Sequence, residues 1–384
     1  MSSLVIVGGG AAGFATARAY REAGGDGAVT ILTPEPDNPY VRPALSKGFL
    51  RGEADAGDIG LQDDDFYADN HIEVRRETTV EALDPASRTL TLAGGETLEY
   101  ERCVLATGSE PVRIPVPGGD DPAIHTLRSL SDARNLRERV EGAQTAAVIG
   151  TGFIGCEAAA SLAMRGLRVT QVSDEHIPHL KRLGEDAGSR IASWLTELGV
   201  RLQLGAGVES LGGGVVRVPG SPPVEADVVL MAVGVRPRSA LAEQAGLETE
   251  RNHVVTDEHM RTSADGVYAV GDIAIALHGL AGRRLTVEHW VDAQAHGKAA
   301  GASAAGREAA WESVPAFFSG IGERTLKYKA WGDGFDEIRF VEHPGGAFTV
   351  FYGQHGKVVG VLAYERDEAY EAAGEMIAEG RPMP

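Results

Sequence analysis

The sequence predicts an α/β protein with two Rossmann-like units, each built on a parallel sheet, and a C-terminal α+β unit with an antiparallel sheet. Two observations predict the parallel sheets: a glycine-rich strand, turn and helix pattern begins at residue 4, and it recurs roughly 140 residues later. Because strand–helix–strand crossovers are right-handed, each pattern opens a parallel sheet. A third observation predicts the antiparallel unit, since aromatic and β-branched residues alternate with polar ones after residue 314, in LKYKAW, IRFVE, AFTVFYG and KVVGVLAY.

The first pattern, LVIVGGGAAGFATARAYREAG at 4–24, reads as an apolar strand, a glycine turn and an alanine-rich helix, and the strand VTIL follows at 29–32. Gly8 permits a tight turn, Gly10 lets a pyrophosphate approach the backbone, and Gly13 allows close packing of the helix. The helix N-terminus favours an anion. Glu35, just past the second strand, is placed to accept hydrogen bonds from a ribose 2'-hydroxyl. Together these features predict a dinucleotide site.

The second pattern, AAVIGTGFIGCEAAASLAMRGLRVTQV at 146–172, predicts a second dinucleotide site. Its glycines repeat the three roles, at Gly150, Gly152 and Gly155. Ser173 ends the following strand, and the next two residues, Asp174 and Glu175, would repel a 2'-phosphate. The arginine that usually accompanies NADPH does not occur before Arg182. The pattern therefore favours NADH and leaves NADPH possible.

The rest of the chain predicts how these sites are divided among domains. Short strands separated by turns over 72–108 indicate a small antiparallel excursion that ends in the strand CVLATGS, and the same plan recurs up to ADVVLMAVGVRP at 226–237. VYAVGD at 267–272 is a strand that runs into Gly271 and Asp272, and taken alone it is as consistent with a turn as with a site. We predict a discontinuous unit from 1–110 and 238–308, a second unit at 111–237, and a C-terminal unit at 309–384 closed by the helix EAYEAAGEMIAEG.

Composition restricts the partners and the compartment. The net charge of −19 repels nucleic acid and anionic membranes, so neither is expected as a partner, and an acidic protein would need a local basic patch. The chain has two cysteines, Cys103 and Cys156, in no CxxC arrangement, which favours a reducing compartment. The first strand starts at residue 4 and no uncharged apolar run has membrane-spanning length, so we expect a cytoplasmic protein without a signal peptide. The histidines show no metal-ligand spacing, and no metal site is predicted.

The combination of VIVGGGAAG, LATGS, VIGTGFIGCE, MAVGVRP and VYAVGD resembles the pyridine-nucleotide and FAD-dependent oxidoreductases related to glutathione reductase, over residues 4 to about 305. The segments PYVRPALSKGFL at 39–50 and EHW at 288–290 are similar to the NADH-dependent ferredoxin and rubredoxin reductases. In that branch the resemblance implies that Arg42 and Lys47 lie against the flavin and that Asp272 holds its ribityl chain. It also implies that Glu157 faces Lys47 and that Trp290 lies near the pyrimidine end of the ring. A lysine there would stabilise negative charge on the flavin.

The motifs and the resemblance together give a set of predicted site residues. For FAD they are Gly8, Gly10, Ala12, Gly13, Glu35, Arg42, Lys47, Val80, Ala106, Thr107, Gly108, Gly271, Asp272, Glu288, His289 and Trp290. For NADH they are Gly150, Gly152, Phe153, Ile154, Gly155, Glu157, Asp174, Glu175, Val233 and Gly234. Lys47 and Glu157 are the predicted catalytic pair. Because hydride transfer needs proximity and orientation more than a base, His289 is expected to position its neighbours without transferring a proton.

Residues 36–60 contain no cysteine, which excludes the dithiol chemistry of the disulfide reductases, and both cysteines are expected to be inert. We predict an enzyme, monomeric or homodimeric, that passes electrons from NADH through FAD to a small ferredoxin or rubredoxin. Two alternatives stay open: an NADH oxidase or a quinone or dye reductase, and an NADH-sensing flavoprotein similar to apoptosis-inducing factor. The family often has a Trp and an Asp in the motif that begins near VPAFFS, and this chain departs from it, so the acceptor is open. Lys327 and Lys329 share one strand face, which is either a contact for an acidic partner or a solvated face.

Overall fold

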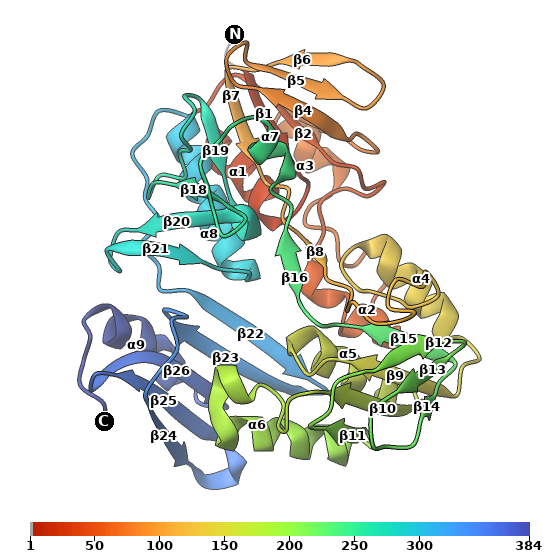
Figure 1. The fold of residues 1–384 in the computed structure, drawn as a ribbon. Helices are drawn as coiled ribbons and strands as arrows, with labels where there is room; N and C mark the ends of the chain where they lie inside the picture. Colours follow the sequence, from red (N-terminus) through yellow and green to blue (C-terminus); the bar gives the residue numbers. More distant parts are fainter. Residues whose placement is uncertain (1–2) are drawn as a thin grey trace.

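The structure is a computed structural model that describes residues 3–384. Its first parallel sheet has the strand order β19-β7-β1-β2-β3 and forms the core of the upper lobe in Figure 1. The strands are β1 (Ser3–Val7), β2 (Ala28–Leu32), β3 (Ile72–Arg75), β7 (Arg102–Leu105) and β19 (Val267–Ala269). Val5 and Ile6 of the central strand are almost fully buried. Apolar runs with turns at their ends therefore form buried parallel strands, as the sequence predicts.

Two helices far apart in the sequence pack against each other beside this sheet: α1 (Ala11–Glu22) and α8 (Trp290–Ala304). Gly297 and Gly301 make the contact possible, because a Cβ on either would lie 2.3 Å from a backbone oxygen of α1. This packing brings the start of α8 to the same end of the sheet as the first glycine turn. Residues near 290 and residues near 10 therefore face one another across that end.

Shorter elements surround the upper lobe. The antiparallel excursion consists of β4 (Val80–Asp84), β5 (Thr89–Leu92) and β6 (Thr97–Glu99). A second small sheet consists of β17 (Thr249–Glu250), β18 (His253–Thr256), β20 (Ala274–His278) and β21 (Arg283–Thr286). The helical turns α3 (Asp64–Asp69), α7 (Ala240–Gln244) and η2 (Gly271–Ile273) also lie in this lobe. The turns η1 (Arg42–Ala44) and α2 (Gly48–Arg51) instead extend toward the second parallel sheet, where α2 packs against the helices of that unit.

The second parallel sheet repeats the plan, with the order β11-β10-β9-β15. Its strands are β9 (Thr145–Ile149), β10 (Arg168–Ser173), β11 (Arg201–Leu204) and β15 (Val228–Met231), and its helices are α4 (Leu130–Val140), α5 (Phe153–Met164) and α6 (Leu180–Glu197). The matching antiparallel excursion is β12 (Ser210–Gly212), β13 (Val215–Arg217) and β14 (Val224–Glu225). Two paired antiparallel strands, β8 (Ser109–Pro111) and β16 (Val235–Pro237), carry the chain between the two parallel sheets.

The C-terminal sheet is antiparallel, with the order β22-β23-β26-β25-β24, and lies at the lower left in Figure 1. Its elements are β22 (Ala316–Ile321), β23 (Arg324–Ala330), β24 (Glu337–Glu342), η3 (Pro344–Gly346), β25 (Phe348–Gln354), β26 (Lys357–Tyr364) and α9 (Asp367–Ala378). Lys327 Nζ lies 2.7 Å from Asp367, and Lys329 Nζ lies 4.2 Å from the Tyr370 ring centre. Both lysines therefore contact α9.

The C-terminal sheet packs on the second parallel unit. The Trp194 ring of α6 stacks 6.0 Å from Phe348, and Tyr352 donates a 2.9 Å hydrogen bond to the backbone oxygen of Leu183. The predicted fold class is confirmed, whereas the exact domain bounds stay a prediction, and residues 1 and 2 of the first range lie outside the described residues. Within residues 3–384, no helix combines the length and apolar character needed to cross a membrane.

Candidate functional site

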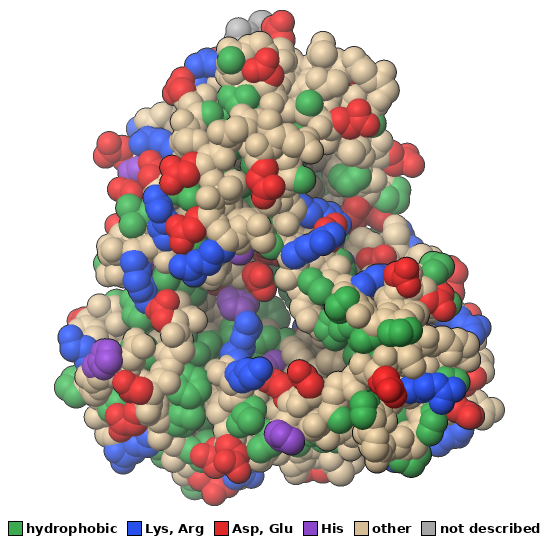
Figure 2. Space-filling view, viewed as in Figure 1, with side chains coloured by type: hydrophobic (Ala, Val, Ile, Leu, Met, Phe, Trp, Pro, Cys, Tyr) green, Lys and Arg blue, Asp and Glu red, His purple; other side chains and the backbone are tan. Residues whose placement is uncertain are grey.

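A cavity of about 1650 Å³ lies where the two parallel units and the C-terminal sheet meet. Figure 2 shows the molecule hollowed there, with basic and histidine side chains around the opening. Small-molecule sites usually measure roughly 300–1000 Å³. The cavity is therefore large enough for more than one such ligand, as two dinucleotides would require.

The first glycine turn closes one end of the cavity. Gly8 has φ +126°, and a Cβ on it would lie 2.1 Å from the backbone oxygen of Ala106, so a side chain cannot fit. A Cβ on Gly13 would lie 2.0 Å from the backbone oxygen of Gly8, so this glycine sets how closely α1 approaches the turn. At Gly10, the N-cap of α1, the nearest atom to an added Cβ is 3.8 Å away on Arg42, and no side chain caps the helix. The uncapped N–H groups face the cavity and suit a phosphate.

The second glycine turn has the same construction. Gly150 has φ +104°, and its Cβ would meet the backbone oxygen of Ala232 at 2.3 Å. A Cβ on Gly155 would meet the oxygen of Gly150 at 2.4 Å. Gly152, the N-cap of α5, has no atom within 4 Å of an added Cβ and no side-chain cap. The residues that are present therefore fit two pyrophosphate groups, one at each turn.

Charged residues gather beside the first turn. Arg42 pairs with one carboxylate oxygen of Glu35, and the Tyr40 hydroxyl donates a 2.5 Å hydrogen bond to the other oxygen. Arg42 also donates to the backbone oxygen of Arg128 at 2.8 Å. Burial, together with the neighbouring Glu35 carboxylate, raises the pKa of Tyr40, although Arg42 opposes this, so the phenol stays a donor. The acid predicted to contact a ribose is thus held in place by its own loop.

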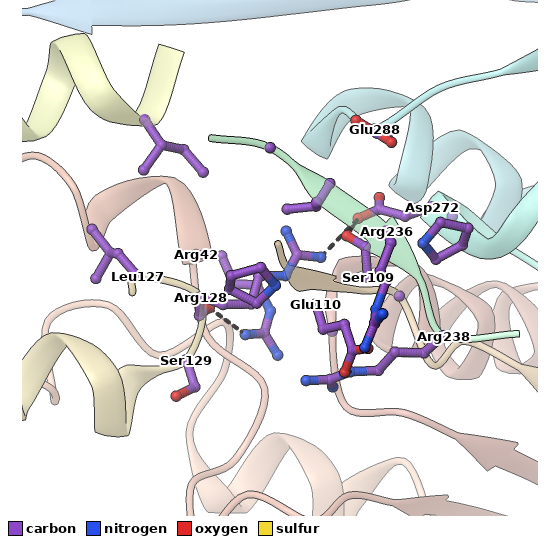
Figure 3. Close-up of a pocket in the computed structure, with 18 of the residues that line it drawn as sticks. Arg42, Ser109, Glu110, Leu127, Arg128, Ser129, Arg236, Arg238, Asp272 and Glu288 are labelled. Carbon is purple, nitrogen blue, oxygen red and sulfur yellow. Dashed lines mark hydrogen bonds and ion pairs between the residues drawn. The ribbon is translucent and has the colours of Figure 1, made fainter. Parts of the chain in front are cut away.

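Asp272 forms a second charged centre, shown in Figure 3. One of its oxygens accepts from the Ser109 hydroxyl at 2.5 Å and from the Arg128 guanidinium at 2.7 Å. Burial opposes ionisation of Asp272, but Arg128 and Ser109 outweigh it and lower the pKa. Sequence reasoning missed Arg128 and Ser109. Ser109 is the last residue of the motif CVLATGS and begins β8, whereas no motif singles out Arg128, which only precedes the Ser129 cap of α4.

The predicted catalytic pair lies between the two turns. Lys47 Nζ is 2.6 Å from a carboxylate oxygen of Glu157, and the two side chains are 18% and 5% exposed. The same oxygen accepts from the Ser46 hydroxyl at 2.6 Å, and the other oxygen accepts from Ser319 at 2.7 Å. Neither serine was predicted from the sequence. Each belongs to the site only through its hydrogen bond to Glu157, which is more than a hundred residues away from both.

The acids after β10 line the far end of the cavity. Asp174 and Glu175 both line it, and the Thr151 hydroxyl lies 2.9 Å from Ser173 Oγ and 3.4 Å from Glu175. Arg182, on the first turn of α6, also lines the cavity. The site therefore contains both acidic and basic groups, with the acids nearest the end of the strand.

Aromatic rings and a histidine cover the junction with the C-terminal sheet. Phe317 of β22 lies 4.4 Å from Phe153 and 4.7 Å from His289, measured between ring centres. Burial and nearby Arg182 lower the pKa of His289 to about 4, so the imidazole is neutral near pH 7. This agrees with a positional role. Phe317 was missed by the sequence reasoning, which placed no site residue in this sheet.

The cavity collects nearly all of the predicted site residues. Those that line it are Gly8, Gly10, Ala12, Glu35, Arg42, Lys47, Val80, Ala106, Thr107, Gly108, Gly150, Gly152, Phe153, Ile154, Glu157, Asp174, Glu175, Val233, Gly234, Gly271, Asp272, Glu288, His289 and Trp290. Gly13 and Gly155 lie behind the turns instead. Cys103 and Cys156 are free and fully buried, and burial raises the pKa of Cys156 to about 12, which disfavours a reactive thiolate. Among residues 3–384, no cluster of three or more His, Cys, Asp or Glu side chains could hold a metal ion.

Known proteins that are similar to this chain in sequence and structure include several reductases. The family model described as pyridine nucleotide-disulphide oxidoreductase matches residues 2–297. Rhodocoxin reductase of Rhodococcus erythropolis is 30% identical, covering 99% of this chain and 90% of that protein. The ferredoxin reductase component of chlorobenzene dioxygenase from Cupriavidus sp. (strain PS12) is 32% identical, with 97% and 92% covered. In the crystal structure of a covalent putidaredoxin reductase–putidaredoxin complex, the matching chain has a TM-score of 0.93 and 29% identity, with 99% and 94% covered. The chain belongs to the pyridine nucleotide-disulphide oxidoreductase family.

Proposed function

We propose that the protein is an FAD-dependent NADH reductase that passes electrons to a small iron–sulfur protein, a ferredoxin or a rubredoxin. The observation that carries the proposal is the Lys47–Glu157 pair, held at 2.6 Å between two glycine turns that open into one cavity. The names of the similar proteins, rhodocoxin reductase and a ferredoxin reductase component, support the class of acceptor. Since residues 36–60 contain no cysteine, the disulphide chemistry in the family's description does not apply to this chain.

The first turn and its neighbours would hold FAD. The uncapped N-terminus of α1 at Gly10 is free for the pyrophosphate, and Glu35 suits the adenosine ribose. Asp272 would accept from the ribityl hydroxyls, while Lys47 and Trp290 would lie against the ring. When bound, FAD supplies the ability to take two electrons together from a nicotinamide and release them singly.

The second turn would hold NADH. The N-terminus of α5 at Gly152 faces the cavity without a cap, and Glu157, four residues after Phe153, places the same helix against Lys47. Asp174 and Glu175 favour a ribose with free hydroxyls over a 2'-phosphate. The two sites share one cavity, so the nicotinamide and the flavin ring can meet without passing through bulk water.

The chain's own residues supply orientation and charge. Lys47 donates to the Pro43 backbone oxygen at 3.0 Å and to Glu157, and its third N–H has no partner among residues 3–384. That N–H can point a positive charge at the ring, where negative charge collects on reduction. Phe317 and Phe153 cover the junction and exclude water. His289 is neutral near pH 7, so it lacks the acidic imidazolium proton that a general acid would supply.

We also propose the division into units at 1–110 with 238–308, at 111–237 and at 309–384. Strands β8 and β16 support the two boundaries near 110 and 237, because this antiparallel pair carries the chain from one parallel sheet to the other and back. The two free, buried cysteines suit a reducing compartment, and we propose the cytoplasm. Whether the protein is a monomer or a homodimer stays a prediction of the sequence.

Anaerobic stopped-flow reduction of the purified protein tests the proposal. NADH should bleach the bound flavin, and ferredoxin or rubredoxin should then reoxidise it faster than quinones or oxygen do. Lys47→Met should slow the reduction, whereas Lys298→Met, at an exposed lysine that forms no ion pair within residues 3–384, should not. Reoxidation by quinone or oxygen alone would reject the iron–sulfur acceptor, and the absence of bound flavin would reject the whole proposal.

A further inference from the structure

Glu157 joins three segments that are distant in the sequence. Ser46 and Lys47, which precede α2, each donate to Oε2 at 2.6 Å. Ser319 donates to Oε1 at 2.7 Å, and the Gly320 backbone N–H lies 3.3 Å from the same oxygen. A carboxylate has room for about four hydrogen bonds. Both oxygens of Glu157 are therefore occupied, one by the Lys47 segment and the other by strand β22.

The second contact of β22 is steric. A Cβ on Gly320 would lie 3.2 Å from Lys47 Cε and 3.4 Å from its Cδ, and it would meet no other atom within 4 Å. The backbone of Gly320 lies outside the left-handed region, so its conformation does not require glycine. Glycine is suited to this position because it leaves space for the aliphatic part of Lys47, which lies against Gly320 and extends to Glu157.

We propose that Ser319 and Gly320 are positioning residues for the Lys47–Glu157 pair, so that the C-terminal sheet supplies part of the redox site. Ser319 fixes the carboxylate from the side opposite Lys47, and Gly320 leaves the space in which the lysine stem lies. The inference rests on the proposed function for the meaning of the pair. The geometry that it uses does not depend on a bound cofactor.

Loss of the Ser319 hydroxyl would free two side chains, Glu157 and Lys47, to move. Glu157 is 5% exposed and would, without Ser319, keep an oxygen that has only one weak backbone donor. An unsatisfied buried acceptor draws its carboxylate toward other donors. Any rotation of Glu157 moves Lys47, since within residues 3–384 the lysine has only one other partner, the Pro43 oxygen. A small displacement at a reacting centre costs much in rate, because orientation contributes a large part of catalysis.

The test uses Ser319→Ala and Gly320→Ala, which act on the pair from different sides, with Ser313→Ala as the matched control. Ser313 is exposed, precedes the same strand, and its hydroxyl makes no hydrogen bond within residues 3–384. The first readout is acetylation of Lys47 by an amine-reactive acetyl ester, followed by mass spectrometry, relative to the exposed Lys298. The second is the reduction potential of the bound flavin. The third is the rate of flavin reduction by NADH.

In Ser319→Ala we expect Lys47 acetylation to rise about fivefold and flavin reduction to fall about tenfold. The equilibrium constant for reduction of the flavin should fall about tenfold. This corresponds to a reduction potential lower by roughly 30 mV for a two-electron couple. Gly320→Ala should change each quantity about threefold in the same direction, because the lysine stem must shift by only a few tenths of an ångström. Ser313→Ala should match the unmodified protein.

A double-mutant cycle shows whether Ser319 acts through Glu157. In a Glu157→Gln background, Ser319→Ala should have less than about a twofold further effect, since contacting residues are not additive. Full additivity, or Lys47 acetylation and a flavin potential in both variants that match the unmodified protein, would overturn the inference. If the unmodified protein binds no flavin, the proposed function fails, and Lys47 acetylation still decides this inference on its own.

Discussion

Replacing Arg128 with methionine should destabilise the protein strongly, because it leaves Asp272 buried without its cation. The Asp272 side chain is 10% exposed, the Arg128 side chain is 24% exposed, and their atoms lie 2.7 Å apart. Breaking a fully buried pair by removing one partner costs about 3–5 kcal/mol. Because Arg128 is partly exposed and Ser109 still donates to Asp272, we expect Arg128→Met to lower the free energy of unfolding by about 2–3 kcal/mol at pH 7.

The pH dependence of this loss identifies its cause. The pKa of Asp272 is lowered in the folded protein, so the pair contributes stability above the unfolded pKa and loses it as the pH falls through the folded pKa. Without Arg128, burial dominates and raises the pKa of Asp272 in the folded protein. The variant is therefore less stable at pH values where the carboxyl is ionised in the unfolded chain. The deficit of Arg128→Met should therefore be largest at pH 7 and shrink toward pH 4.

Urea unfolding of the flavin-free protein, followed by circular dichroism at pH 7 and pH 4, measures this deficit directly. Arg236→Met is the matched control, because Arg236 pairs with Glu110 at the surface, where the side chains are 72% and 36% exposed. That variant should lose less than about 1 kcal/mol at either pH. Equal losses for the two variants at pH 7, or a deficit of Arg128→Met that grows on acidification, would refute the reasoning.

The first glycine turn, the acids after β10 and a buried histidine can each be tested by one substitution. Gly8→Ala should lower the thermal midpoint and the flavin content, because its Cβ would lie 2.1 Å from the Ala106 oxygen, whereas Gly57→Ala, with open space around its Cβ, should change neither. The kcat/KM with NADH should be about tenfold or more above that with NADPH, because the acids repel a 2'-phosphate. Glu175→Gln should reduce this ratio of the NADH value to the NADPH value. Burial lowers the pKa of His296 to about 3, so stability falls as the pH drops below the unfolded value near 6.5. Urea titrations at pH 7 and pH 5 give the free energy of unfolding that is lost on acidification. This loss should be on the order of 2 kcal/mol smaller in His296→Gln than in the unmodified protein.

The fold could be predicted from the sequence because its signals are local. Each glycine turn needs positive φ and a bare Cα within a stretch of six residues, and Gly8 and Gly150 both have that geometry. The antiparallel C-terminal sheet follows from its two-residue alternation. The domain bounds are harder to predict, because they depend on where the short pair β8 and β16 crosses, and strands of three residues carry little pattern.

The site residues that were missed act through tertiary contacts. Arg128 and Ser109 matter because both reach Asp272, which lies 144 and 163 positions away from them in the sequence. Ser319 matters because β22 packs on α5, and a serine in a strand gives no sign of the helix it will meet. Lys47 and Glu157 were found only through resemblance, since no spacing rule connects two residues 110 positions apart.

The two dinucleotide sites share a plan but differ in how their acids are held, and this predicts which ligand stays bound. Glu35 is held by Arg42 and the Tyr40 hydroxyl, both from the loop that follows it, so its carboxylate is fixed by charge-assisted contacts. The Glu175 carboxylate has only the neutral Thr151 hydroxyl, at 3.4 Å, as a side-chain partner among the described residues.

A carboxylate that is already fixed in place loses little freedom when it binds a ribose, and such preorganisation favours tight binding and slow release. We therefore expect flavin to remain bound through desalting while the nicotinamide exchanges at every turnover. Arg42→Met should release flavin faster without changing the apparent KM for NADH, as flavin fluorescence and steady-state kinetics would show. A rise in that KM with flavin retention unchanged would mean that the loop of Arg42 closes the nicotinamide site instead, and the assignment of the two turns would have to be exchanged.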